Sequence, residues 1–147
     1  MKKQAYTVIA MMVLIGSMAV VGQAQNNGRP QLVAEIPFQF NVGNKTLPAG
    51  EYLVRSISDD SPTVVLNIQS RDGNASAMLI MRSVEGRAAN SAKLLFNRYG
   101  NQYFFAQMWV DGEKLGLEAP RSRTERAAQL ELAGIKPTAE MVAVKRR

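Results

Sequence analysis

Apolar and polar residues alternate along much of the chain with the period of two expected for strands that bury one face. Such runs cover residues 32–42 and 51–58, flank turn sequences at 71–74 and 99–102, and recur at 139–144. Short connections favour antiparallel neighbours. The pattern predicts a mainly β fold: an antiparallel meander of six to seven strands, arranged as a small barrel or a sandwich, with one C-terminal helix packed on it.

The first hairpin is predicted around Asp72-Gly73. This dipeptide suits the positive φ angles of a two-residue type I′ turn, which would place Arg71 opposite Asn74. The resulting register leaves one face apolar, whereas a slip of one residue would mix the two faces. The apolar face pairs Ile68 with Ala77, Leu66 with Leu79 and Val64 with Met81.

Gly100-Asn101 predicts the second hairpin, with a type I′ or II′ turn. We expect a uniform register from this turn to the ends of both strands. It pairs Phe96 with Phe105, Arg98 with Tyr103, Asn97 with Phe104, Ala92 with Trp109, Leu95 with Ala106 and Lys93 with Met108.

The strand run at 32–42 contains Pro37, which has no N–H to donate to a neighbouring strand, so an edge strand is expected. Residues 43–50 are typical of a loop with a proline-containing turn.

A helix is predicted at about residues 122–133. Ser122 and Glu125 form a capping-box pattern at its start, Gly134 suits the position after its end, and Pro137 follows. Its shallow apolar side suggests that it lies on a sheet. That side consists of Ala127 and Leu130, with Ala128 and Leu132 nearby.

The first 24 residues are typical of a secretory signal peptide. Lys2 and Lys3 precede an apolar run, and Gly22-Gln23-Ala24 fits a cleavage site after Ala24. The alternative is a membrane anchor, but the run at 6–21 is shorter than the ~20 residues that span a bilayer. We therefore expect an exported protein, periplasmic or secreted, without a transmembrane span after cleavage. A flexible lead-in at 25–31 would precede a single β-rich domain at 32–147 with a basic C-terminal end.

The composition excludes several chemistries. The 147 residues include no His and no Cys, so there can be no disulfide, no thiolate zinc site, no Cys nucleophile and no Ser-His-Asp triad. Cleavage of the predicted signal peptide would remove Lys2 and Lys3 and lower the net charge from +6 to +4. This net charge comes from residues 121–147, because basic and acidic residues balance in the preceding part of the mature chain. An exported chain has little access to nucleic acid, so we expect no nucleic-acid partner, and the charge points to an anionic surface or other envelope component.

Aromatic residues form the first candidate site. Six of the ten aromatics lie within residues 96–109. One interpretation is a hairpin with core on both faces. The other is a pocket for a small apolar ligand, with these ligand-binding candidates: Tyr99, Tyr103, Phe105 and Trp109.

Basic residues near the C-terminus form the second candidate site. They could be a solvated helix face and chain end, or they could contact an anionic envelope surface. The candidates are Arg121, Arg123, Arg126, Lys145, Arg146 and Arg147.

The carboxylates suggest no catalytic residue. Asp59-Asp60 precede Ser61-Pro62 and are typical of a turn. Asp111, Glu113 and Glu118 are expected in one loop and could bind Ca²⁺ weakly, but the EF-hand pattern is absent. We predict no metal site and no cofactor.

Four segments carry a resemblance to known proteins: Ile36-Pro37-Phe38-Gln39-Phe40-Asn41-Val42-Gly43, Leu47-Pro48-Ala49-Gly50-Glu51-Tyr52, 96–104 (FNRYGNQYF) and 120–126 (PRSRTER). They resemble segments of small exported proteins of acidobacteria-type soil bacteria, a group without known activity. The resemblance implies an exported, β-rich protein and no site residues.

The expected function is a non-enzymatic structural or interaction module of the cell envelope. The alternative is a carrier of an apolar or amphipathic ligand in an aromatic-lined β pocket. A filled core would favour the former, and an aromatic-lined cavity the latter.

Overall fold

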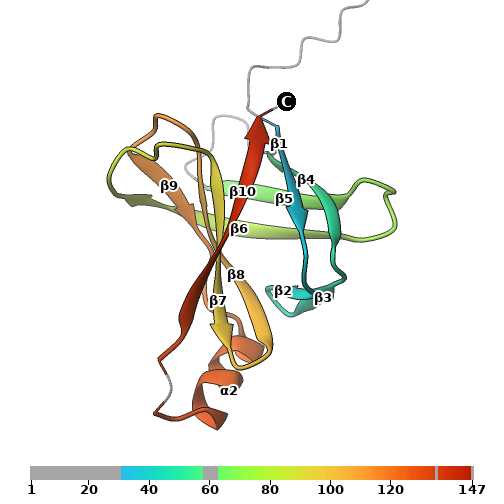
Figure 1. Cartoon of the computed structure of the whole chain (residues 1–147), viewed down its shortest axis with the longest axis vertical. Coiled ribbons are helices and arrows are strands. Elements are labelled where there is room, and N and C mark those ends of the chain that lie inside the picture. Colours follow the sequence, from blue (N-terminus) through green and yellow to red (C-terminus); the bar gives the residue numbers. More distant parts are fainter. Residues whose placement is uncertain (1–30, 58–62, 135, 147) are drawn as a thin grey trace, which may run out of the picture.

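The computed structural model describes residues 31–57, 63–134 and 136–146, which form ten strands and one helix (Figure 1). The predicted signal peptide, most of the lead-in, Asp59-Asp60 and Arg147 lie outside the described residues. The elements are β1 (Leu32–Ile36), β2 (Phe40–Val42), β3 (Lys45–Leu47), β4 (Gly50–Ser56), β5 (Val64–Ser70), β6 (Ser76–Glu85), β7 (Lys93–Tyr99), β8 (Gln102–Trp109), β9 (Leu115–Glu118), α2 (Arg123–Glu131) and β10 (Thr138–Arg146).

Eight of the strands close into an antiparallel barrel. Their order is β8-β7-β10-β1-β4-β5-β6-β9, and β9 pairs back onto β8. β2 and β3 extend the sheet beyond β8, where Asn41 of β2 pairs in parallel with Phe104. The mainly β fold is confirmed, and of the two predicted arrangements the barrel is correct.

Side chains fill the interior of the barrel. Phe96 is fully buried, and its ring meets those of Phe38, Phe40 and Phe105 edge-on at 5.2, 5.4 and 5.7 Å. Inward-facing aliphatic residues of the other strands complete the same cluster. Such T-shaped ring contacts add stability beyond the burial of apolar area.

The β5–β6 hairpin has the predicted register. Val64 pairs with Met81, Leu66 with Leu79 and Ile68 with Ala77. The predicted two-residue turn is wrong, because the Gly73 N–H donates to the Ser70 carbonyl and the Ser70 N–H donates to Ala75. Asp72 accepts from the Ser70 hydroxyl and the Asn74 backbone N–H, and these bonds stabilise a four-residue loop at 71–74.

The β7–β8 hairpin keeps the predicted register only near its turn. Phe96 pairs with Phe105 as expected. Farther from the turn, Leu95 pairs with Gln107 and Lys93 pairs with Trp109. The predicted pairs in this part of the hairpin are therefore wrong: Leu95 with Ala106, Lys93 with Met108 and Ala92 with Trp109. A β-bulge inserts Ala106 as an extra residue between the two registers. The Ala106 carbonyl accepts the Ala119 N–H, so a contact outside the hairpin stabilises the bulge.

Three short strands account for most of the difference in strand number. β3 lies inside the predicted loop at 43–50, and β9 lies after the predicted end of the second hairpin. The run at 32–42 divides at Pro37 into β1 and β2, and β1 lies between β10 and β4 rather than at an edge. The break avoids placing a residue without an N–H inside the β1 ladder.

Helix α2 follows the predicted bounds closely. Ser122 is its N-cap, and its hydroxyl accepts the Glu125 N–H at 3.0 Å. The predicted apolar side is partly wrong: Ala127 and Leu130 are exposed, while Ala128 packs on Tyr99 and Phe104. No helix in the described ranges is long and apolar enough to cross a bilayer.

β10 confirms the predicted last strand. It pairs with β7 over residues 138–143 and with β1 over 144–146, and so completes the wall of the barrel.

Candidate functional site

Two of the four candidate aromatic residues pack on the inner side of the barrel. Phe105 is buried against Phe96, and the ring of Tyr103 stacks on that of Phe38 at 3.9 Å. The guanidinium of Arg98 lies over the Tyr103 ring, 5.3 Å from its centroid.

The other two aromatic residues lie on the opposite face of the hairpin, and both are covered. Tyr99 is buried beneath Ala128 of α2. The indole ring of Trp109 fits against two glycines: a Cβ atom would come within 2.7 Å of the ring at Gly116 and within 2.4 Å at Gly86. The four candidates therefore do not line one common pocket.

The basic candidates lie at opposite ends of the barrel. Arg121, Arg123 and Arg126 surround the start of α2 and are all exposed. Lys145 and Arg146 end β10 near the C-terminus, at the other end of the molecule (Figure 1). The structure thus separates the five of these candidates that it describes into two groups.

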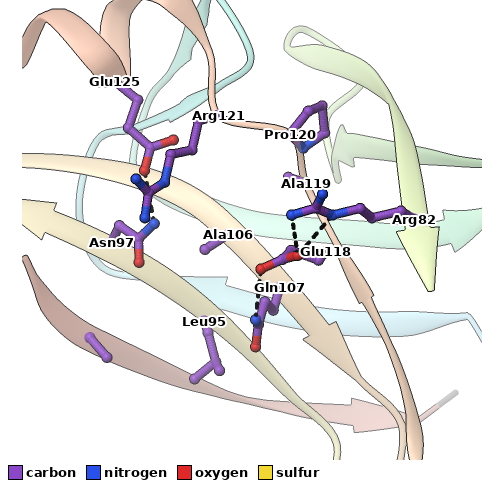
Figure 2. Close-up of a pocket in the computed structure, with 11 residues that line it drawn as sticks. Arg82, Leu95, Asn97, Ala106, Gln107, Glu118, Ala119, Pro120, Arg121 and Glu125 are labelled. Atoms are coloured by element: carbon purple, nitrogen blue, oxygen red, sulfur yellow. Dashed lines mark hydrogen bonds and ion pairs between the residues drawn. The ribbon is translucent and has the colours of Figure 1, made fainter. Parts of the chain in front are cut away.

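A cleft of about 580 Å³ opens between α2 and strands β6 to β10 (Figure 2). Its apolar lining comes from Leu95, Ala106, Ala119, Pro120 and Ala139. Its polar groups are Arg82, Asn97, Gln107, Glu118, Arg121 and Glu125. Of these, only Arg121 belongs to the site residues predicted from sequence.

Glu125 fastens the helix to the barrel wall. The residue is only 3% exposed, and its Oε1 atom accepts hydrogen bonds from Asn97 Nδ2 at 2.8 Å and from the Tyr99 hydroxyl at 3.3 Å. The predicted capping box is therefore half formed: Ser122 caps the helix, but the Glu125 carboxylate binds β7 instead of returning to Ser122. A buried carboxylate needs such donors to offset its lost hydration.

A second polar group is centred on Glu118 of β9. Arg82 donates to Glu118 Oε2 from Nε at 2.9 Å and approaches it with Nη2 at 2.7 Å. Gln107 Nε2 donates to Glu118 Oε1 at 3.3 Å, and the Trp109 indole N–H donates to Gln107 Oε1 at 3.0 Å. The bulge at Ala106 sets the position of Gln107 in this chain of bonds.

The cleft is lined by two carboxylates, those of Glu118 and Glu125, at its two ends (Figure 2). Glycosidases use two carboxyl groups that face each other across the bond to be cleaved. Here Glu118 pairs with Arg82, and Glu125 anchors the helix through Asn97. Both carboxylates are therefore held as hydrogen-bond acceptors of neighbouring side chains. Glu118 lies on a strand rather than in the predicted loop, and the described residues contain no cluster of three or more metal-ligating side chains.

The free energy of unfolding should decrease at alkaline pH, because two buried tyrosines have raised pKa values. Burial, followed by repulsion from Glu125, raises the pKa of Tyr99, against an opposing effect of Arg121. Burial, followed by the Asp72 carboxylate, raises the pKa of Tyr52, whose hydroxyl donates to the Pro48 carbonyl. Tyrosine in the unfolded chain ionises at about pH 10, and the raised pKa values mean that the folded state favours the neutral hydroxyls. Their contribution to the free energy of unfolding is therefore complete below about pH 10 and is lost as the pH rises through the folded-state pKa values.

Chemical unfolding from about pH 8 to about pH 11 measures this loss. The unfolding midpoint should decline above about pH 10, and the decline should be smaller in the Tyr52→Phe/Tyr99→Phe variant. An equal decline in the wild type and the variant would assign the effect to other groups.

Sequence reasoning missed most of the cleft because its members are distant along the chain. Asn97 and Glu125 are separated by 28 positions, and Arg82 and Glu118 by 36. One signal was present: the capping-box pattern had already singled out Glu125.

Comparisons of the chain with protein-family models, with curated proteins and with solved structures found no match.

Proposed function

We propose that the protein is an exported, non-enzymatic interaction module that contacts an anionic component of the cell envelope through the helix end of its barrel. The observation that carries this proposal is the group formed by Arg121, Arg123 and Arg126, here called the arginine group. All three residues are exposed at the start of α2.

The arginine group is free to bind an external anion. Within the described residues, none of the three guanidiniums forms an ion pair; Arg121 and Arg126 make only long hydrogen bonds of 3.4 Å, to Gln129 and to the Ser122 carbonyl. Cations at a helix N-terminus are opposed by the helix dipole. An anion bound there would relieve both this opposition and the mutual repulsion of the arginines.

The filled barrel supports a surface function. Phe96, Phe105 and their neighbours occupy the space in which a carrier would hold its ligand. The alternative, a carrier of a small apolar ligand, would require these rings to move apart. A module that binds with its outer surface requires no such change.

Vesicle co-sedimentation tests the arginine group. The purified protein should bind vesicles containing phosphatidylglycerol, but not vesicles of phosphatidylcholine alone, and binding should weaken as salt shortens the Debye length. At about 1 kcal/mol per charge, the Arg121→Gln/Arg123→Gln/Arg126→Gln variant should bind about 100-fold more weakly.

A matched control removes three positive charges elsewhere. Arg55, Arg87 and Lys114 are exposed and lie outside α2. Their triple Gln variant should bind within about threefold of the wild type, since only the charges facing the surface contribute. Salt-insensitive binding, or an equal loss in the two triple variants, would overturn the proposal.

A further inference from the structure

The buried carboxylate of Glu125 presents one oxygen to the cleft. Both of its hydrogen bonds, from Asn97 and Tyr99, end on Oε1. Oε2 accepts no hydrogen bond from the described residues. Among these residues it is nevertheless not one of the side-chain atoms that are both fully buried and without a hydrogen-bond partner. Oε2 therefore keeps some solvent exposure. Because Glu125 lines the cleft and its Oε1 is anchored, Oε2 is the oxygen left to accept a donor from a ligand bound there.

Arg121 supplies the opposite charge at the same end of the cleft. Arg121 and Glu125 both line the cleft, at the same end of it (Figure 2). Glu125 raises the pKa of Tyr99 and Arg121 lowers it. Arg121 donates to the protein only through the 3.4 Å bond to Gln129. Most of its five N–H groups remain available, in a geometry that suits a carboxylate.

The remaining charges of the cleft are already paired. Arg82 and Glu118 neutralise each other at the other end (Figure 2). A purely anionic ligand would be repelled by Glu125, and a purely cationic ligand would be repelled by Arg121. A ligand that carries both charges complements both groups.

We propose that this cleft binds a small zwitterion of the α-amino acid type, with its ammonium group on Glu125 Oε2 and its carboxylate on Arg121. The apolar lining, which includes Leu95 and Ala106, would receive an aliphatic side chain. The volume of about 580 Å³ lies within the range of small-molecule sites. This site overlaps the surface contact of the arginine group at Arg121 alone, since Arg123 and Arg126 do not line the cleft.

Isothermal titration calorimetry with charge-matched ligands tests the proposal. The probes are L-alanine, L-leucine and L-glutamine, together with the N-acetyl and amide derivatives of each, which lack one of the two charges. At least one of the free amino acids should bind. Its N-acetyl and amide derivatives should bind at least about tenfold more weakly, since each loses a charge-assisted hydrogen bond.

Substitutions connect the binding to the two residues. Arg121→Gln and Glu125→Gln should each weaken amino acid binding at least about tenfold, whereas Arg123→Gln, on the same segment but outside the cleft, should leave it unchanged. Arg121→Gln removes no contact of the barrel core, so it remains informative even if Glu125→Gln destabilises the helix.

Three results would overturn the proposal. They are the absence of binding by all three free amino acids at about 10 mM, equal affinity for the zwitterion and its singly charged derivatives, and binding that survives both substitutions. Vesicle binding distinguishes this site from the proposed function, because Arg123→Gln/Arg126→Gln should weaken vesicle binding while leaving amino acid binding unchanged.

Discussion

Replacing Phe96 by alanine should lower the free energy of unfolding by about 4 kcal/mol. The ring is fully buried and meets three other rings at 5.2 to 5.7 Å. Truncation removes the buried ring and leaves a cavity that β7, paired on both sides, cannot collapse to fill. Equilibrium unfolding in guanidinium chloride measures the loss.

The adjacent residue provides the control. Leu95 lies on the opposite face of β7, is half-buried and lines the cleft. Leu95→Ala should cost no more than about 2 kcal/mol, since less apolar surface is lost from a site open to water. Equal costs at the two positions would contradict the inward orientation of Phe96.

Replacing Gly116 by alanine should cost about 3 kcal/mol, at the upper end of the effects of overpacking. The added Cβ would lie 2.7 to 2.8 Å from three atoms of the Trp109 ring. The ring cannot simply shift away, because Gly86 confines its far edge. The indole must therefore leave its position, which also breaks its bond to Gln107 at the edge of the cleft.

Intrinsic fluorescence reports on the Gly116→Ala variant directly, because Trp109 is the only tryptophan of the chain. Its fluorescence emission should shift to the red in Gly116→Ala, as the ring becomes hydrated. In a Trp109→Ala background the glycine substitution should be neutral or slightly stabilising, because the clash is gone and alanine restricts the unfolded chain. An undiminished cost in that background would exclude the ring as the cause.

Local patterns predicted the elements that are long enough to show a period or a cap. The β5–β6 register followed from a single apolar face, and the bounds of α2 followed from Ser122 and Gly134. β2, β3 and β9 have only three or four residues each, too few to reveal an alternation. The bulge at Ala106 escaped prediction because its stabilising partner, Ala119, belongs to another strand.

The candidate site was predicted less well than the fold. The aromatic residues were correctly recognised as a concentration of apolar bulk, and the structure places them in the core or beneath other elements. Arg121 alone was selected in advance among the residues of the cleft. A side chain's chemistry can be read from its identity, whereas its neighbours depend on strands far away in the chain.

The sequence by itself determined the β class, the two hairpins, the C-terminal helix and the absence of His and Cys chemistry, because these depend on residues close together or on composition alone. The tertiary structure decided the rest. Closure through β8 and β9, the filling of the interior and the joining of Glu125 to Asn97 all depend on contacts between distant segments. Contacts between distant segments form cooperatively, when the barrel closes as a whole, and they leave no pattern in any single segment of the sequence.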